Sequence, residues 1–192
     1  MRFKLLDNAI DTLRFGLDFY WKYLQLEDKY NEENPGYLKM AVICIQNSLE
    51  LFIKKILSNY NELLIYDDLS NKKLLEIFMI NKNEYKNMPL DYFIINQTKI
   101  HTIDYTNLIS RFRIICELNE FQYNTLENIG QLRNKITHFG IDKVMDFHEV
   151  IVTINNSLDL ISELIYDELK TGKDEIHILD PIYEVILDIL EI

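Results

Sequence analysis

The chain contains few of the residues that interrupt regular structure. Among its 192 residues there are only 5 glycines and 3 prolines, while 48% of the residues are hydrophobic. Glycine and proline break helices and strands, and apolar residues supply a buried core. This composition therefore predicts a folded chain that is rich in regular structure. A chain of this length is most simply one domain, covering residues 1–192.

Long apolar runs and cysteines are also scarce. No stretch approaches the roughly 18 uninterrupted apolar residues of a membrane span, so we expect no membrane contact. The first residues reach Asp7 before an apolar signal core can form, and we expect no export signal. Cys44 and Cys116 both lie in apolar, helix-periodic surroundings, where buried and reduced thiols are expected. Together these features predict a cytoplasmic protein.

The usual signatures of a metal or cofactor site are missing as well. His101, His148 and His177 have no cysteine or acid at metal-ligand spacing. The chain has no glycine-rich phosphate loop, no G-x-S-x-G turn and no Cys–His nucleophile arrangement. We therefore expect neither a metal nor a cofactor.

Positive charge is in short supply too. With 20 Lys and Arg against 31 Asp and Glu, the formal net charge is −11 at pH 7. This balance argues against a protein that coats nucleic acid, because such a protein presents a broad basic face. It does not exclude an enzyme that cuts RNA, which needs only a local basic cleft.

What the chain has in abundance is helical periodicity. Apolar residues recur at three- and four-residue steps along most of its length, as on one face of an amphipathic helix. The expected helices are residues 8–26, 37–60, 70–80, 105–118, 124–140, 142–170 and 180–192. The short turn at Asn31–Gly36 should make the first two an antiparallel hairpin.

Capping residues and breakers set the expected boundaries. Ser70 and Asp104 are predicted N-caps, Asn124 opens the helix that follows, and Gly140 ends it. Asp180 and Pro181 suit the first turn of a last helix. Residues 81–103 read as an ordered loop or a small β-hairpin, of which we prefer the loop.

The predicted fold is thus an all-α antiparallel bundle of about four to five main helices. Its core spans residues 8–170, residues 81–103 form a loop insertion, and residues 180–192 add an extra C-terminal helix.

The residues most suggestive of chemistry lie within Gln131–Gly140. Arg133 is a permanent cation, Asn134 follows it directly, and His138 supplies an imidazole, a side chain that commonly acts as a proton shuttle. A fixed cation beside a proton shuttle is what metal-free cleavage of a phosphodiester requires. An Arg, an Asn directly after it and a His five positions on resemble the motif of the HEPN superfamily. The stretch that carries Glu50 and Lys54, and the helix entrance at Asp104, look similar to that superfamily too.

The resemblance implies an all-helical, usually dimeric ribonuclease, as in toxin–antitoxin and antiviral defence systems. In our hypothesis His138 removes the proton from a ribose 2′-hydroxyl, and Arg133 binds the non-bridging phosphate oxygens. Asn134 would orient the Arg or the His or touch the phosphate, and Lys135 would attract phosphate at the rim. The substrate would be RNA, because its own hydroxyl attacks.

Helix geometry separates the two principal residues. Five residues turn an α-helix through about 500°, which leaves Arg133 and His138 roughly 140° apart. Either the helix unwinds near Gly140, or two copies of the chain form the site together. The resemblance implies the second arrangement, in which Arg and His of each protomer face those of the partner.

Other interpretations remain open for these residues. Arg133 could pair with Glu127 or another acid, and His138 could cap the end of its helix. Glu50 and Lys54 are most simply a surface ion pair. The alternative function is a non-catalytic helical module that binds a protein partner or a nucleotide.

The superfamily also sets an expectation about control. Toxins of this kind commonly carry a modified Tyr two positions after the His, where this chain has Gly140. We therefore expect control by a bound antitoxin or other regulatory protein rather than by tyrosine modification.

Overall fold

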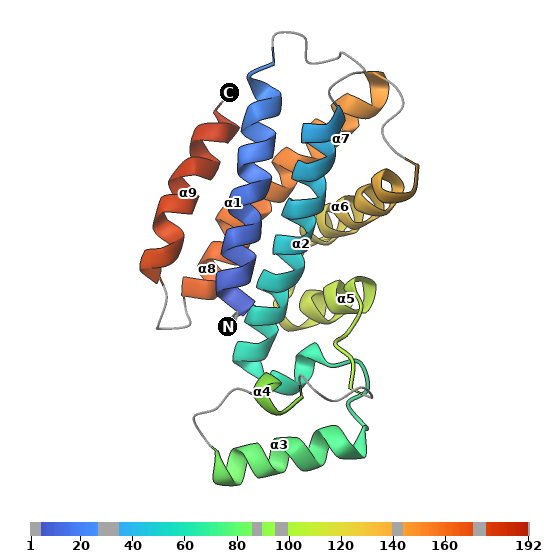
Figure 1. Ribbon diagram of the computed structural model, residues 1–192, viewed down its shortest axis with the longest axis vertical. Helices are drawn as coiled ribbons and strands as arrows, with labels where there is room; N and C mark the ends of the chain where they lie inside the picture. The colour runs from blue at the N-terminus through green and yellow to red at the C-terminus, as the bar shows by residue number, and fades with distance from the viewer. Residues whose placement is uncertain are drawn as a thin grey trace.

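Two long helices, α1 (Leu5–Leu24) and α2 (Pro35–Tyr60), run side by side as the expected hairpin (Figure 1). The computed structural model describes residues 5–26, 35–85, 90–94, 100–139, 144–170 and 176–191. Gly16 sets the closeness of the two helices, because a Cβ at this position would lie 2.8 Å from Cγ1 of Ile45. Only a residue without a side chain allows this approach.

The remaining described elements are also helical, and they confirm the all-α fold class. In chain order they are a 3₁₀ turn (Glu62–Ile65), α3 (Lys72–Glu84), α4 (Asp91–Ile94), α5 (Tyr105–Ile115), α6 (Glu120–Phe139), α7 (Val144–Leu160), a π-helical turn (Ile161–Ile165), α8 (Tyr166–Lys170) and α9 (Ile176–Leu190). Helix α3 lies at one end of the molecule, apart from the main bundle (Figure 1).

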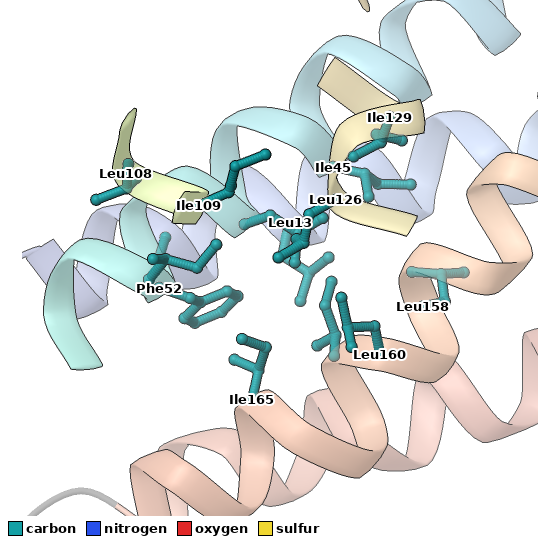
Figure 2. Close-up of a cluster of buried hydrophobic side chains, with 14 of the residues drawn as sticks. Leu13, Ile45, Phe52, Leu108, Ile109, Leu126, Ile129, Leu158, Leu160 and Ile165 are labelled. Atoms are coloured by element: carbon teal, nitrogen blue, oxygen red, sulfur yellow. The ribbon is translucent and has the colours of Figure 1, made fainter. Parts of the chain in front are cut away.

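The core lies where α1, α2, α5, α6 and the α7–α8 segment converge (Figure 2). Side chains from each of these helices interlock there, and all of those named are less than 6% exposed: Leu13, Ile45, Phe52, Ile109, Leu126, Ile129, Leu158, Leu160 and Ile165. The predicted apolar stripe of α6 is confirmed by the burial of Leu126, Ile129, Leu132 and Ile136. Helix α6 is therefore fixed in rotation, and this decides where its polar residues point.

Several predicted boundaries shift. Asp104 caps α5 as predicted, since its Oδ1 accepts a hydrogen bond from the Asn107 N–H at 3.0 Å. The cap of α3 is Asn71 rather than Ser70, whose hydroxyl instead donates to Asp68. Helix α6 begins at Glu120 rather than at Asn124.

The early start of α6 has a local cause. Asn119 and Gln122 bond reciprocally, each side chain accepting from the other's backbone N–H at 2.9 and 3.0 Å, as in a capping box. The first turn contributes Phe121, which is 63% exposed, so apolar periodicity gave no signal there. The predicted end at Gly140 falls outside the described residues.

The segment 81–103 is not a plain loop. Helix α3 continues to Glu84, and α4 occupies Asp91–Ile94. Thr102 forms an isolated antiparallel bridge with Tyr66, so the strand-like partner lies outside the segment rather than in a hairpin within it. Residues 86–89 and 95–99 fall outside the described part of the chain.

The C-terminal third also differs in detail. The predicted helix 142–170 is interrupted by the π-helical turn, although its apolar stripe is buried as expected except at Ile151, which is partly buried. Helix α9 starts at Ile176, so Pro181 lies inside it rather than in its first turn. The proline costs one backbone hydrogen bond near the helix start, while Ile182, Ile186 and Ile189 beyond it are buried.

The expectation for the two cysteines is met in part. Cys44 and Cys116 are both free thiols, but each is partly rather than fully buried. Among the described helices, none has the length and apolarity needed to cross a bilayer.

Candidate functional site

The candidate motif occupies the last turns of α6, which is α-helical from Arg133 through His138. Unwinding between the two residues therefore does not occur in this structure. Arg133 is partly buried, whereas His138 lies on the exposed side of the helix. Within one copy of the chain, the two side chains leave α6 in different directions, as the helix geometry predicts.

Two neutral amides hold the Arg133 guanidinium. Its Nε donates to Oε1 of Gln46 at 3.2 Å, and its Nη1 donates to Oδ1 of Asn134 at 2.8 Å. In the described part of the chain no carboxylate forms an ion pair with Arg133, so the alternative pairing with Glu127 is not observed. The guanidinium is thus oriented without being neutralised.

Gln46 is a site residue that the sequence did not suggest. It lies on α2 and is only 1% exposed. A buried amide is costly unless its polar atoms find partners, and the Arg133 N–H meets this requirement for Oε1. The available signal was its register, because Val42 and Leu49, four residues before and three after Gln46, are apolar positions on the same face of the helix.

Asn134 connects Arg133 to the side of α6 on which His138 lies. Asn134 and His138 are four residues apart, which places them about 40° from each other around the helix. Because Arg133 donates to the Asn134 side chain, its guanidinium is drawn towards that ridge. Lys135 is exposed on the same end of α6. The structure thus joins Arg133 with Asn134 and places His138 one turn further along.

A pocket of about 490 Å³ opens beside Arg133, between α2, α5 and α6. Its lining includes Arg133 and Asn134 but not His138, and it includes three carboxylates, those of Glu50, Asp104 and Glu127. The pocket is therefore not a positively charged cradle for a phosphate. Any phosphate bound by Arg133 must lie at its rim rather than at its floor.

One wall of this pocket is the ring of Tyr105. Its hydroxyl donates to the backbone carbonyl of Leu126 at 3.0 Å, which ties α5 to α6. Burial, and secondarily the negative charge of Glu50, raise the pKa of Tyr105 well above its usual value, although Arg133 opposes this. The phenol therefore stays protonated. Gly130 allows the ring to approach, because a Cβ there would lie 2.6 Å from a ring carbon.

Glu50 and Lys54 form an ion pair as expected, but the pair is enclosed and does not lie on the surface. Nζ of Lys54 lies 2.8 Å from Oε1 of Glu50, and the two side chains are only 10% and 20% exposed, respectively. Lys54 also donates to Oγ1 of Thr102 at 3.4 Å. Helix α2 is the central helix of the bundle, in contact with α1, α5, α6 and α7. It has little solvent-exposed surface, and the pair is enclosed for that reason.

No protein-family model, curated protein or solved structure matches the chain. Within the described residues, no group of three or more His, Cys, Asp or Glu side chains is placed to hold a metal ion.

Proposed function

We propose that the protein is a metal-independent endoribonuclease of the HEPN type, acting as a homodimer with a composite Arg/His site. The observation that carries the proposal is the state of Arg133. Gln46 and Asn134 hold its guanidinium in place, while no described carboxylate neutralises it. An arginine arranged in this way is ready to bind an anion bidentately, and the planar fork of the guanidinium matches a phosphate.

The proposed reaction is attack by the substrate's own hydroxyl. His138 removes the proton from the ribose 2′-hydroxyl, and O2′ forms a bond to the adjacent phosphorus. The bond between phosphorus and O5′ breaks, and the departing O5′ takes up a proton from solvent water. The products are a 2′,3′-cyclic phosphate and a free 5′-hydroxyl. Proton transfer by a positioned side chain contributes about 10² to 10⁴ in rate.

The other motif residues support this step. Arg133 stabilises the additional negative charge that develops on the non-bridging oxygens. Asn134 positions Arg133 through the hydrogen bond between their side chains. Lys135, exposed one residue further on, attracts phosphate towards the rim. A role as a toxin or antiviral effector, neutralised by an antitoxin or another regulatory protein, belongs to the same proposal.

The test is cleavage of mixed cellular RNA by the purified protein in EDTA. We expect the wild type to cleave and to leave cyclic-phosphate ends, and Arg133→Ala and His138→Ala to lose this activity. Matched controls are Arg14→Ala and His148→Ala, which remove the same side chains from exposed positions on α1 and α7. If the two motif variants cut RNA as fast as these controls do, the proposal is wrong.

One observation favours the second candidate, a non-catalytic interaction module. The pocket beside Arg133 presents three carboxylates, where a nuclease is expected to have a positive surface. Under this alternative the wild type is folded and dimeric but cuts no RNA in the same assay, and Arg133 serves to bind a partner.

A further inference from the structure

The pocket beside Arg133 leads towards His138 along one ridge of α6. Glu127, Gln131 and Asn134 line it from successive turns of the helix, and His138 follows Asn134 after four more residues. Those four residues advance the helix by about 6 Å. A nucleotide can span this interval with its base in the pocket and its sugar–phosphate beside Asn134 and His138.

Of the three carboxylates that line this pocket, that of Glu127 is the one that forms neither an ion pair nor a helix cap within the described residues. Glu50 is engaged by Lys54 at 2.8 Å, and Asp104 caps α5 through Asn107. In the described part of the chain, no hydrogen bond or ion pair engages the carboxylate of Glu127, which is partly buried. A shielded carboxylate in a pocket is best satisfied by a ligand that brings N–H donors.

The rest of the lining suits a flat heteroaromatic ring. Tyr105 and Ile109 provide an apolar wall, and Gln131 and Asn134 add amide groups at the edge. Bases of single-stranded RNA are recognised in this way, by stacking on aromatic side chains and hydrogen bonding along their edges. The volume of about 490 Å³ falls within the usual range of small-ligand pockets, about 300–1,000 Å³.

We infer that this pocket binds guanine, on the nucleotide whose 2′-hydroxyl attacks, and that Glu127 selects it. The inference rests on the proposed ribonuclease function. A carboxylate accepts two parallel N–H bonds, and the N1–H and N2–H₂ groups of guanine supply two adjacent donors. The O6 and N7 acceptors of guanine suit amide N–H donors such as those of Gln131. Uracil has a single N–H flanked by carbonyl oxygens, which a carboxylate repels.

The inference is tested with four oligoribonucleotides that differ only in the base 5′ of one cleavable bond, the remaining sugars being 2′-deoxy. We expect the wild type to cleave after guanosine, and Glu127→Gln to lose about tenfold or more of that preference. Glu120→Gln is the matched control, because it removes a carboxylate from the same helix at a position that is 82% exposed and outside the pocket. Equal cleavage after all four bases, or an unchanged preference in Glu127→Gln, overturns the inference.

A second measurement separates the pocket from the chemistry. Guanosine and uridine monophosphates are titrated calorimetrically into the wild type, Glu127→Gln and Glu120→Gln. If no RNA is cut but guanosine monophosphate still binds in preference to uridine monophosphate, with a loss only in Glu127→Gln, the ribonuclease proposal fails and guanine recognition stands. If neither nucleotide binds, or both bind equally, guanine recognition fails whatever the cleavage assay shows.

Discussion

The contact between Gly130 and the Tyr105 ring gives a sharp test of how α5 and α6 pack around the pocket. Replacing Gly130 by Ala would place a Cβ 2.6 and 2.9 Å from two ring carbons of Tyr105. The ring cannot swing away freely, because the Tyr105 hydroxyl is bonded to the Leu126 carbonyl at 3.0 Å. The added methyl group must therefore push the two helices apart or break that hydrogen bond.

Two opposing effects decide the size of the change. Alanine in place of glycine inside a helix favours folding by about 1 kcal/mol. Overpacking a well-filled contact costs about 1–3 kcal/mol. We expect a net loss of about 1 kcal/mol for Gly130→Ala in the wild type. In a Tyr105→Ala background the clash is absent, and the same substitution should stabilise the fold by about 1 kcal/mol.

The change of sign is the prediction, and urea unfolding of the four proteins measures it. Each free energy of unfolding comes from linear extrapolation, with the slope compared across variants to check that unfolding stays cooperative. A coupling of about 2 kcal/mol between positions 105 and 130 is expected, in line with values for residues in direct contact. If Gly130→Ala stabilises both backgrounds equally, the close packing described here is refuted.

Three further predictions concern the enclosed charges, a thiol and the composite site. Glu50→Gln leaves the more deeply enclosed Lys54 without its ion-pair partner and should lower the free energy of unfolding by about 2–4 kcal/mol. The double variant Glu50→Gln/Lys54→Met should lower it by less. Equal losses of the two variants in urea unfolding would contradict an enclosed pair. Burial raises the pKa of Cys116 from 9.0 to about 11. Because the thiol loses its proton at a lower pH in the unfolded chain, its contribution to the free energy of unfolding should fall as pH rises from about 9 to 11. Iodoacetamide at pH 9 should alkylate Cys116 more slowly in the folded than in the unfolded protein. Equal rates would argue against the raised pKa. Mixed and reannealed Arg133→Ala and His138→Ala proteins should regain part of the RNA cleavage that each lacks alone, and no recovery in verified heterodimers would exclude a site built from two copies.

The fold was largely predictable from sequence because apolar periodicity is a local signal. Most predicted core positions of α1, α2, α6 and the α7–α8 segment are buried as their spacing indicates, whereas Met40 on α2 is 38% exposed. The ends of helices were harder to predict where the terminal turn carries no apolar residue that continues the buried stripe. The start of α6 is such a case, since its cap uses Asn119 and Gln122 and its first turn exposes Phe121.

The surroundings of the motif could not be read from sequence, because they depend on contacts between distant segments. Gln46 and Arg133 lie 87 residues apart in the chain, and nothing local to either residue indicates that they meet. The Glu50–Lys54 pair shows the same limit. Four-residue spacing predicts the contact, but only the packing around α2 determines that the pair is enclosed rather than solvated.

The geometry of α6 restricts the dimer arrangements that can bring an Arg133 and a His138 together. Since the helix remains regular from Arg133 to His138, the two side chains lie on different faces, and only the bond from Arg133 to Asn134 draws the cation towards the ridge of His138. A second copy placed with the same end of α6 opposite would bring an Arg133 to the His138 of its partner. Two α6 helices crossing at their midpoints in opposite directions would instead hold the two motifs apart. The composite site thus requires a dimer in which the C-terminal ends of α6 meet, with each pocket open towards the shared phosphate position so that one nucleotide can reach both.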